Sequence, residues 1–169
     1  SNESFINWAW KAAGGTATAM SSPALAVYKW DGNATDVTGN YDATAVDVTY
    51  TTGKFGQCVV AGTTNPSLNL NMTQSHTDPF SWSFWFYATA NSGIDNLIAA
   101  GNGINIGLEI SKVFLFTGGS NRGSGTSISL NTWNHYVVTF DGSSGWKTYV
   151  NGSLAESITQ TPPSGGAVK

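Results

Sequence analysis

Residues 133–152, WNHYVVTFDGSSGWKTYVNG, decide the fold of this chain. Within them, two runs rich in aromatic and β-branched residues, 133–140 and 146–150, flank the polar segment 141–145, whose Asp, Gly and Ser residues favour a turn. The dipeptide Asn151–Gly152 then suits a two-residue hairpin, because both residues tolerate positive φ. These features predict consecutive antiparallel strands joined by tight turns.

The segment 80–88 has the clearest alternation of residue character. Its even-numbered residues, from Phe80 to Ala88, are all nonpolar and share one face of a strand, while the odd-numbered residues, two serines and two aromatics, share the other. Such a strand lies inside a sheet. Because its second face is partly aromatic, we expect a neighbouring segment to cover that face, or the face to form an exposed concave surface. Further strands are expected at 25–30, 43–50, 57–61, 67–71, 96–100, 105–110, 113–117, 126–130 and 154–159.

The composition fits a single all-β domain. The 169 residues include 40% hydrophobic residues, 20 glycines and only 10% charged residues, which suits short strands joined by many turns. About a dozen strands, spaced about 8–12 residues apart, indicate a sandwich or a barrel. The net charge of -3 is too small to favour nucleic acid or anionic lipid. We therefore expect no nucleic acid as a partner. Since no apolar run is long enough to span a membrane, we also expect no membrane partner.

Several stretches together resemble the laminin G-like, concanavalin A-like superfamily of lectins and glucanases. The aromatic strand at 80–87, the W-x-H run at 133–142 and the Y-V-N-G hairpin at 146–152 are similar to motifs of that superfamily in the same order. Residues 30–40 and the GKFGQ turn at 53–57 resemble the opening of the same domain. The resemblance implies an antiparallel jelly-roll sandwich of two sheets.

Domain organisation follows from where this resemblance ends. We expect the jelly-roll domain at 23–160, between an N-terminal extension at 1–22 and a C-terminal linker at 161–169, where Pro and Gly oppose regular structure. The segment WAWKAAGG at 8–15 is similar to a segment of marine phage tail and fibre proteins. That similarity implies a location on a virion surface or outside the cell and other virion proteins as partners. A homo-oligomer is also compatible with this similarity.

Aromatic side chains are the first candidates for ligand contact, because their rings could pack against the C–H groups of a sugar. Large aromatic residues with strand periodicity usually belong to the core of a sandwich. We assign one set of them to the core and another, at strand ends or on the opposite strand face, to the candidate site. The core set is Trp82, Trp133, Tyr136 and Phe140, and the candidate set is Trp85, Tyr87, Trp146 and Tyr50.

Two further side chains each allow a functional and a structural interpretation. Arg122, the only arginine of the chain, lies in the polar loop 118–124 and could bind a carboxylate or an acidic glycan, or stay solvated. His135 could act as a base if a carboxylate lay nearby. We favour the structural role for His135, in which a hydrogen bond from one ring nitrogen holds a strand.

Calcium is the metal ion that the resemblance implies, because many members of the superfamily hold Ca²⁺ with Asp side chains and backbone carbonyls. Asp36, in the first loop, and Asp141, after the W-x-H strand, are similar in position to such ligands. Both aspartates could instead form turns by hydrogen-bonding to their own backbone, and we give this interpretation more weight.

A non-catalytic recognition or decoration module is the function that these features favour, with carbohydrate or a cell-surface receptor as its ligand. A retaining glucanase would need two carboxyl groups about 5–5.5 Å apart. The glutamates Glu3, Glu109 and Glu156 are not paired with another acid at strand spacing, so we expect no enzymatic activity. A purely structural virion module or a protein-interaction module is the alternative.

Overall fold

The computed structural model describes residues 24–62, 64, 66–74, 77–89, 95–100, 104–118, 121–162 and 166–168. Within these residues every regular element is a β-strand, which confirms the expected all-β class. No helix in this part of the chain is long and apolar enough to cross a membrane. The expected N-terminal extension at 1–22 lies outside the described residues.

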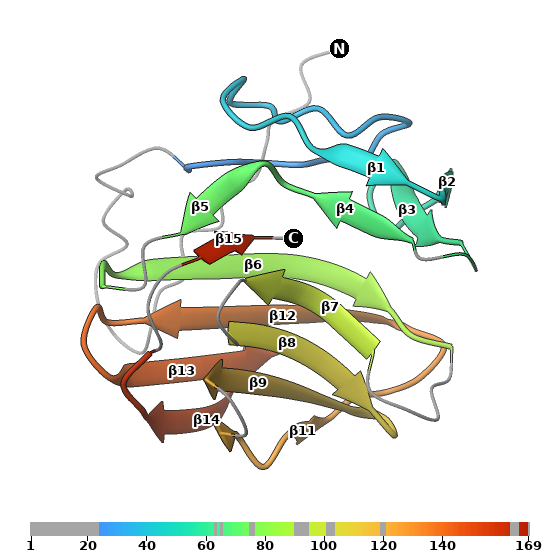
Figure 1. Cartoon of the computed structure of the whole chain (residues 1–169). Coiled ribbons are helices and arrows are strands. Elements are labelled where there is room, and N and C mark those ends of the chain that lie inside the picture. The colour runs from blue at the N-terminus through green and yellow to red at the C-terminus, as the bar shows by residue number, and fades with distance from the viewer. Residues whose placement is uncertain are drawn as a thin grey trace, which may run out of the picture.

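Two antiparallel sheets pack face to face as a sandwich (Figure 1). Sheet I consists of β6 (Phe80–Tyr87), β12 (Trp133–Phe140), β13 (Gly145–Val150) and β14 (Ser153–Thr159), in the order β14-β13-β12-β6. Sheet II consists of β5 (Met72–Gln74), β7 (Asp95–Ala100), β8 (Ile104–Glu109), β9 (Lys112–Gly118), β10 (Asn121–Arg122), β11 (Thr126–Ser127) and β15 (Gly166–Val168). Its order is β10-β9-β8-β7-β15-β5, and β11 also pairs with β9.

The hairpins of sheet I form as the sequence predicts. Phe140 pairs with Trp146 across the five-residue turn, and the N–H of Asp141 donates to the carbonyl of Gly145 at 3.0 Å. Asn151 and Gly152 both have positive φ, 49° and 86°, which is the conformation that a two-residue hairpin requires. These turns join β12 to β13 and β13 to β14, and β12 also pairs with β6 on its other side.

A third layer lies at the edge of the sandwich next to β6 and β15 (Figure 1). It contains the pair β1 (Thr44–Val46) with β4 (Ser67–Asn69) and the pair β2 (Val48–Thr52) with β3 (Gln57–Ala61). The strand expected at 43–50 is broken in two at Asp47, because this residue has a φ of 49°. The strand expected at 25–30 is reduced to one bridge, between Tyr28 and Asp36.

The C-terminal residues also differ from the sequence prediction. Residues 166–168 form β15, which pairs with both β5 and β7 inside sheet II, whereas we expected a linker at 161–169. The reason lies in the tertiary structure. Without β15, the facing backbone groups of β5 and β7 would lack partners, and a third strand satisfies them.

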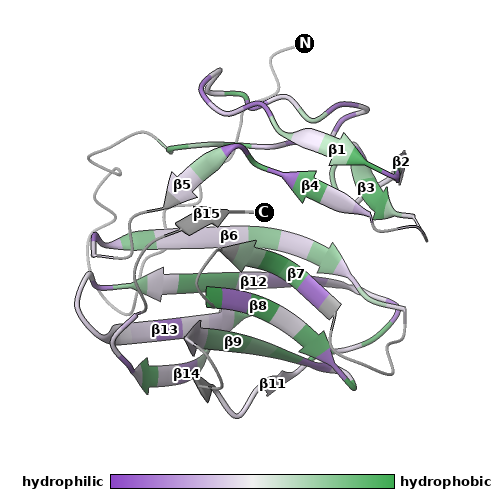
Figure 2. Cartoon of the chain, in the orientation of Figure 1, coloured by the Kyte–Doolittle hydropathy of each residue, from purple (hydrophilic) through white to green (hydrophobic). Residues whose placement is uncertain are grey.

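The core lies between the two sheets because alternate side chains of each strand point inward. In β12 the even-numbered residues from Asn134 to Phe140 face the core, and the odd-numbered residues face the outer side of sheet I. Figure 2 shows β9 as an almost continuous hydrophobic strand. The buried hydrophobic cluster consists of Phe86, Ala88, Ile104, Ile106, Leu108, Val113, Leu115, Ile128, Tyr136, Val138, Phe140 and Trp146.

Candidate functional site

The outer face of sheet I carries a row of aromatic side chains at the point where β6 ends and β12 begins. The antiparallel register places Trp85 opposite His135 and Tyr87 opposite Trp133. All four residues occupy the odd-numbered positions that point away from the core. This region is the partly aromatic second face of β6 that the sequence predicted.

His135 holds the inner part of this row in place. Its ring stacks on the ring of Trp85, with centroids 4.8 Å apart and an interplanar angle of 27°. Its Nε2 lies 2.9 Å from the hydroxyl oxygen of Ser83 on the neighbouring strand. Burial lowers the pKa of His135 below the ordinary 6.5, so the imidazole is neutral at physiological pH. These contacts are those of the structural role that we favoured from the sequence.

The turn between β2 and β3 reaches over Trp85 from the third layer. Phe55 contacts the indole edge-on at a centroid distance of 5.9 Å, and the Nζ of Lys54 lies 4.3 Å from the centre of the Trp85 ring. Asp31 fixes the turn, because its Oδ1 accepts the N–H of Gln57 at 2.7 Å. A side chain at Gly56, which has a φ of 69°, would come within 2.5 Å of the same carboxylate.

The outer part of the row is open to solvent. Tyr87 is 48% exposed and contacts Trp133 edge-on at 5.6 Å, while Phe55 is 61% exposed. We call Phe55, Trp85, Tyr87 and Trp133 the aromatic patch. Grouped exposed aromatic residues of this kind are typical of interaction sites rather than of ordinary protein surface.

The sequence assigned three residues of this region differently. Trp133 was expected in the core, but it faces the outer side because its register partner is Tyr87 rather than a core residue. Lys54 and Phe55 were not candidates, since they lie about 30 positions before Trp85 and only the tertiary fold brings them together. The alternation in β12 is the signal that could have placed Trp133 on the outer face, because Trp133 shares the odd-numbered positions with His135 and Thr139.

Trp146 is not in the aromatic patch. It is 1% exposed, its ring packs against Phe140 at 4.3 Å, and its Nε1 donates to the carbonyl of Gln160 at 2.8 Å. The ring therefore offers no face to a ligand, and the prediction of Trp146 as a ligand-binding residue is wrong. Its neighbour Lys147 points outward instead, because successive residues of a strand alternate between faces.

Two other predicted ligand contacts lie away from the patch. Tyr50 is half-buried in β2, where it pairs with Val59. The backbone of Arg122 belongs to β10 of sheet II, opposite Phe116, and its side chain lies outside the described part of the chain. Of the predicted ligand contacts, only Trp85 and Tyr87 therefore belong to the aromatic patch.

Asp36 is buried, with 1% of its surface exposed, and its carboxylate is surrounded by donors. Its Oδ1 accepts the N–H groups of Val27 at 2.7 Å and Thr38 at 3.0 Å. Its Oδ2 accepts the hydroxyl of Thr38 and the N–H groups of Asn40 at 3.2 Å and Tyr41 at 3.1 Å. Burial by itself raises the pKa of Asp36, but these hydrogen bonds outweigh burial and lower the pKa from 3.8 to about 2.

Asp141 also binds its own backbone. Its Oδ1 accepts the N–H groups of Ser143 at 2.8 Å, Ser144 at 3.1 Å and Gly145 at 3.0 Å. The bonds from Ser143 and Gly145 lower the pKa of this exposed carboxyl group. Both aspartates are thus turn formers, as the more heavily weighted interpretation expected. Among the described residues, no three His, Cys, Asp or Glu side chains group together as they would around a metal ion.

Comparison with known proteins identifies the family. The Laminin G family model described as the concanavalin A-like lectin/glucanases superfamily matches residues 61–168, well over half of the chain. The chain belongs to this superfamily. The expected family resemblance is therefore confirmed, together with the two-sheet sandwich that it implied. No curated protein sequence matches the chain.

Solved structures share the fold of this superfamily domain at low sequence identity. The binding domain of Paraclostridial Mosquitocidal Protein 1 superimposes with a TM-score of 0.63 and 17% identity, over 79% of this chain and 40% of that one. Domain 4 of AbnA, a GH43 extracellular arabinanase from Geobacillus stearothermophilus in complex with arabinotriose, has a TM-score of 0.56 and 18% identity, over 81% of this chain and 84% of that one. The binding domain of botulinum neurotoxin DC in complex with rat synaptotagmin II has a TM-score of 0.58 and 18% identity, over 79% of this chain and 39% of that one. The chain spans about two-fifths of the length of the two toxin domains.

Melting curves can distinguish the calcium-ligand interpretation of Asp36 and Asp141 from the turn-forming one. A Ca²⁺ ion that binds only the folded state would add about 2.7 kcal/mol of stability at a free concentration of ~100 Kd. Because N–H and O–H donors already face the carboxylates of Asp36 and Asp141, we expect melting curves in millimolar CaCl2 and in EGTA to coincide at fixed ionic strength. A higher Tm in calcium that Asp141→Ala removes and Asp78→Ala retains would show instead that Asp141 is a ligand.

Proposed function

We propose that this superfamily domain is a non-catalytic recognition module that binds carbohydrate through the aromatic patch. The proposal rests on one feature, the rings of Phe55, Tyr87 and Trp133 gathered beside Trp85 on the outer face of sheet I. Aromatic rings offer flat apolar faces to the C–H groups of a sugar, and the hydroxyl of Tyr87 can bond to sugar hydroxyl groups. Sheet I fixes the spacing of Trp85, Tyr87 and Trp133 before a ligand arrives, and the turn between β2 and β3 positions Phe55.

The structural neighbours support a binding role. The AbnA domain was solved in complex with arabinotriose, and the neurotoxin domain in complex with rat synaptotagmin II. We infer that the present chain likewise recognises a partner on behalf of a larger protein. Its location on a virion surface or outside the cell is proposed from the resemblance of residues 8–15 to phage tail and fibre proteins.

The acidic residues of the described chain do not favour hydrolysis. Glu109 lies on β8 of sheet II, whereas Glu156 lies on β14 of sheet I. The carboxylate of Glu156 accepts the N–H of Ser124 at 2.8 Å, and the hydroxyl of Ser124 donates to the same oxygen. This contact ties the loop after β10 to β14. A glycosidase would instead present two carboxyl groups to one sugar-binding groove.

A glycan array tests the proposal directly. We expect the wild-type domain to bind a defined subset of glycans, and Tyr87→Ala to weaken that binding about tenfold, which corresponds to ~1.4 kcal/mol. Ile110→Ala is the matched control, since Ile110 is 70% exposed but lies between β8 and β9 of sheet II. Both variants should melt like the wild type, because each removes an exposed side chain.

Two outcomes of the array would contradict this function. Binding that Tyr87→Ala and Trp133→Ala leave intact would move the site away from the aromatic patch. An array without any binding, together with an oligomer detected by light scattering, would favour the structural or protein-interaction module, and the patch would then be a contact between proteins.

A further inference from the structure

The side chain of Lys54 lies against two members of the aromatic patch, Trp85 and Phe55. The ammonium group of Lys54 is 4.3 Å from the centre of the Trp85 ring and 5.6 Å from that of Phe55, and the residue is exposed. Among the described residues no carboxylate forms an ion pair with it. A cation–π contact at an exposed site is weaker than a hydrogen bond between two charged groups, so an anionic ligand can draw the ammonium off the ring.

The indole of Trp85 adds an unused donor at the same place. Its Nε1 is buried and has no hydrogen-bond acceptor among the described residues. A buried donor without a partner calls for an explanation. An oxygen acceptor that reached the edge of the indole ring would satisfy it, because the N–H lies in the ring plane.

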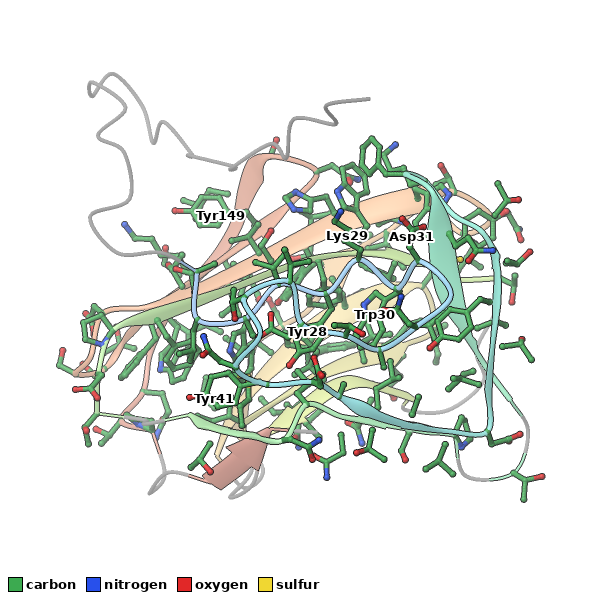
Figure 3. All side chains as sticks on the ribbon, turned by 90° about the horizontal axis from the view of Figure 1, so that it is seen from above. Tyr28, Lys29, Trp30, Asp31, Tyr41 and Tyr149 are labelled. Atoms are coloured by element: carbon green, nitrogen blue, oxygen red, sulfur yellow. The ribbon has the colours of Figure 1, made fainter. Side chains whose placement is uncertain are left out.

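The surrounding surface carries further positive charge. Lys147 is exposed on β13 and points to the outer side of sheet I, opposite Thr139. Figure 3 shows Lys29 and Asp31 on the same N-terminal segment. The N–H of Gln57 donates to the carboxylate of Asp31 but leaves its negative charge, which offsets the charge of Lys29. The exposed positive charge of this face therefore comes from Lys54 and Lys147.

We propose that the carbohydrate recognised by the aromatic patch is acidic, and that its carboxylate or sulfate group pairs with Lys54. This inference rests on the proposed function and names the chemical class of its ligand. In the free domain the ammonium group occupies the face of Trp85. When the acidic ligand binds, the ammonium turns to the anion, and the indole face becomes available to the sugar ring beside Tyr87.

The experiment compares matched acidic and neutral glycans on one array. The acidic arms carry sialylated, uronic and sulfated glycans, and the neutral arm carries the same backbones without the charged group. We expect binding on an acidic arm to be about tenfold stronger than on its neutral counterpart. Lys54→Met, which keeps an unbranched side chain of similar length but removes the charge, should abolish that difference. Lys54→Arg should retain it.

Lys112→Met is the control for net charge, because Lys112 is exposed on β9 of sheet II. It should leave the preference for acidic glycans unchanged. Added NaCl should weaken binding to acidic glycans more than to neutral ones. Equal binding to both arms, or a preference that survives in Lys54→Met, would overturn the acidic-ligand inference and leave carbohydrate binding in place. An array without binding on any arm would overturn both proposals.

Discussion

We expect the Trp146→Ala variant to lose about 4 kcal/mol of unfolding free energy, because removing a fully buried Trp leaves a cavity that the sheets cannot close. Trp146 is 1% exposed and packs against Phe140 at 4.3 Å and Phe80 at 5.8 Å. Its indole N–H also loses the bond to Gln160. For a domain of this length, the loss corresponds to a fall in Tm of roughly 8–16 °C.

Thermal melting of Trp146→Ala beside Tyr87→Ala measures this effect. The contrast is informative because the sequence proposed both residues as ligand contacts, whereas only Tyr87 is exposed. Trp146→Phe should recover part of the lost stability, since it keeps an aromatic ring in the core. A Trp146→Ala domain that melts like the wild type but no longer binds glycans would place Trp146 back in the binding site.

The second large effect concerns Asp36. We expect Asp36→Ala to cost about 3 kcal/mol, because backbone N–H groups of Val27, Thr38 and Tyr41 lose their acceptor at once. Urea denaturation measures the change, and Asp78→Ala is the matched control, since Asp78 is an exposed aspartate. Equal stability of the two variants would mean that water replaces the carboxylate without loss.

The same carboxylate makes stability depend on acid pH. The folded-state pKa of Asp36, about 2, is lower than the 3.8 of an unperturbed aspartate, because hydrogen bonds to its charged form outweigh burial. Its contribution is therefore fully present above pH 3.8 and is lost as the pH falls towards 2. We expect the wild type to lose more stability than Asp36→Asn over this interval. Parallel loss in both proteins would assign the acid sensitivity to other groups.

Strand positions in sheet I could be predicted because they depend on local patterns. The alternation in β6 and the Asn151–Gly152 turn specify which residues extend and where the chain reverses, and both agree with the structure. The same alternation could have shown that Trp146 faces the core, because the adjacent Lys147 must face solvent. Assigning Trp133 to the core failed because its aromatic character was given more weight than its odd-numbered position in β12, which places it on the outer face opposite Tyr87.

By itself, then, the sequence determined the all-β class, the hairpins of sheet I, the aromatic outer face of β6 and the membership of the superfamily. These properties follow from short-range periodicity and turn chemistry, which a few neighbouring residues contain. Only the tertiary structure decided that Lys54 and Phe55 lie over Trp85, and that β15 completes sheet II. Such contacts join segments far apart in the chain, and their partners are chosen by how whole layers pack rather than by any local pattern.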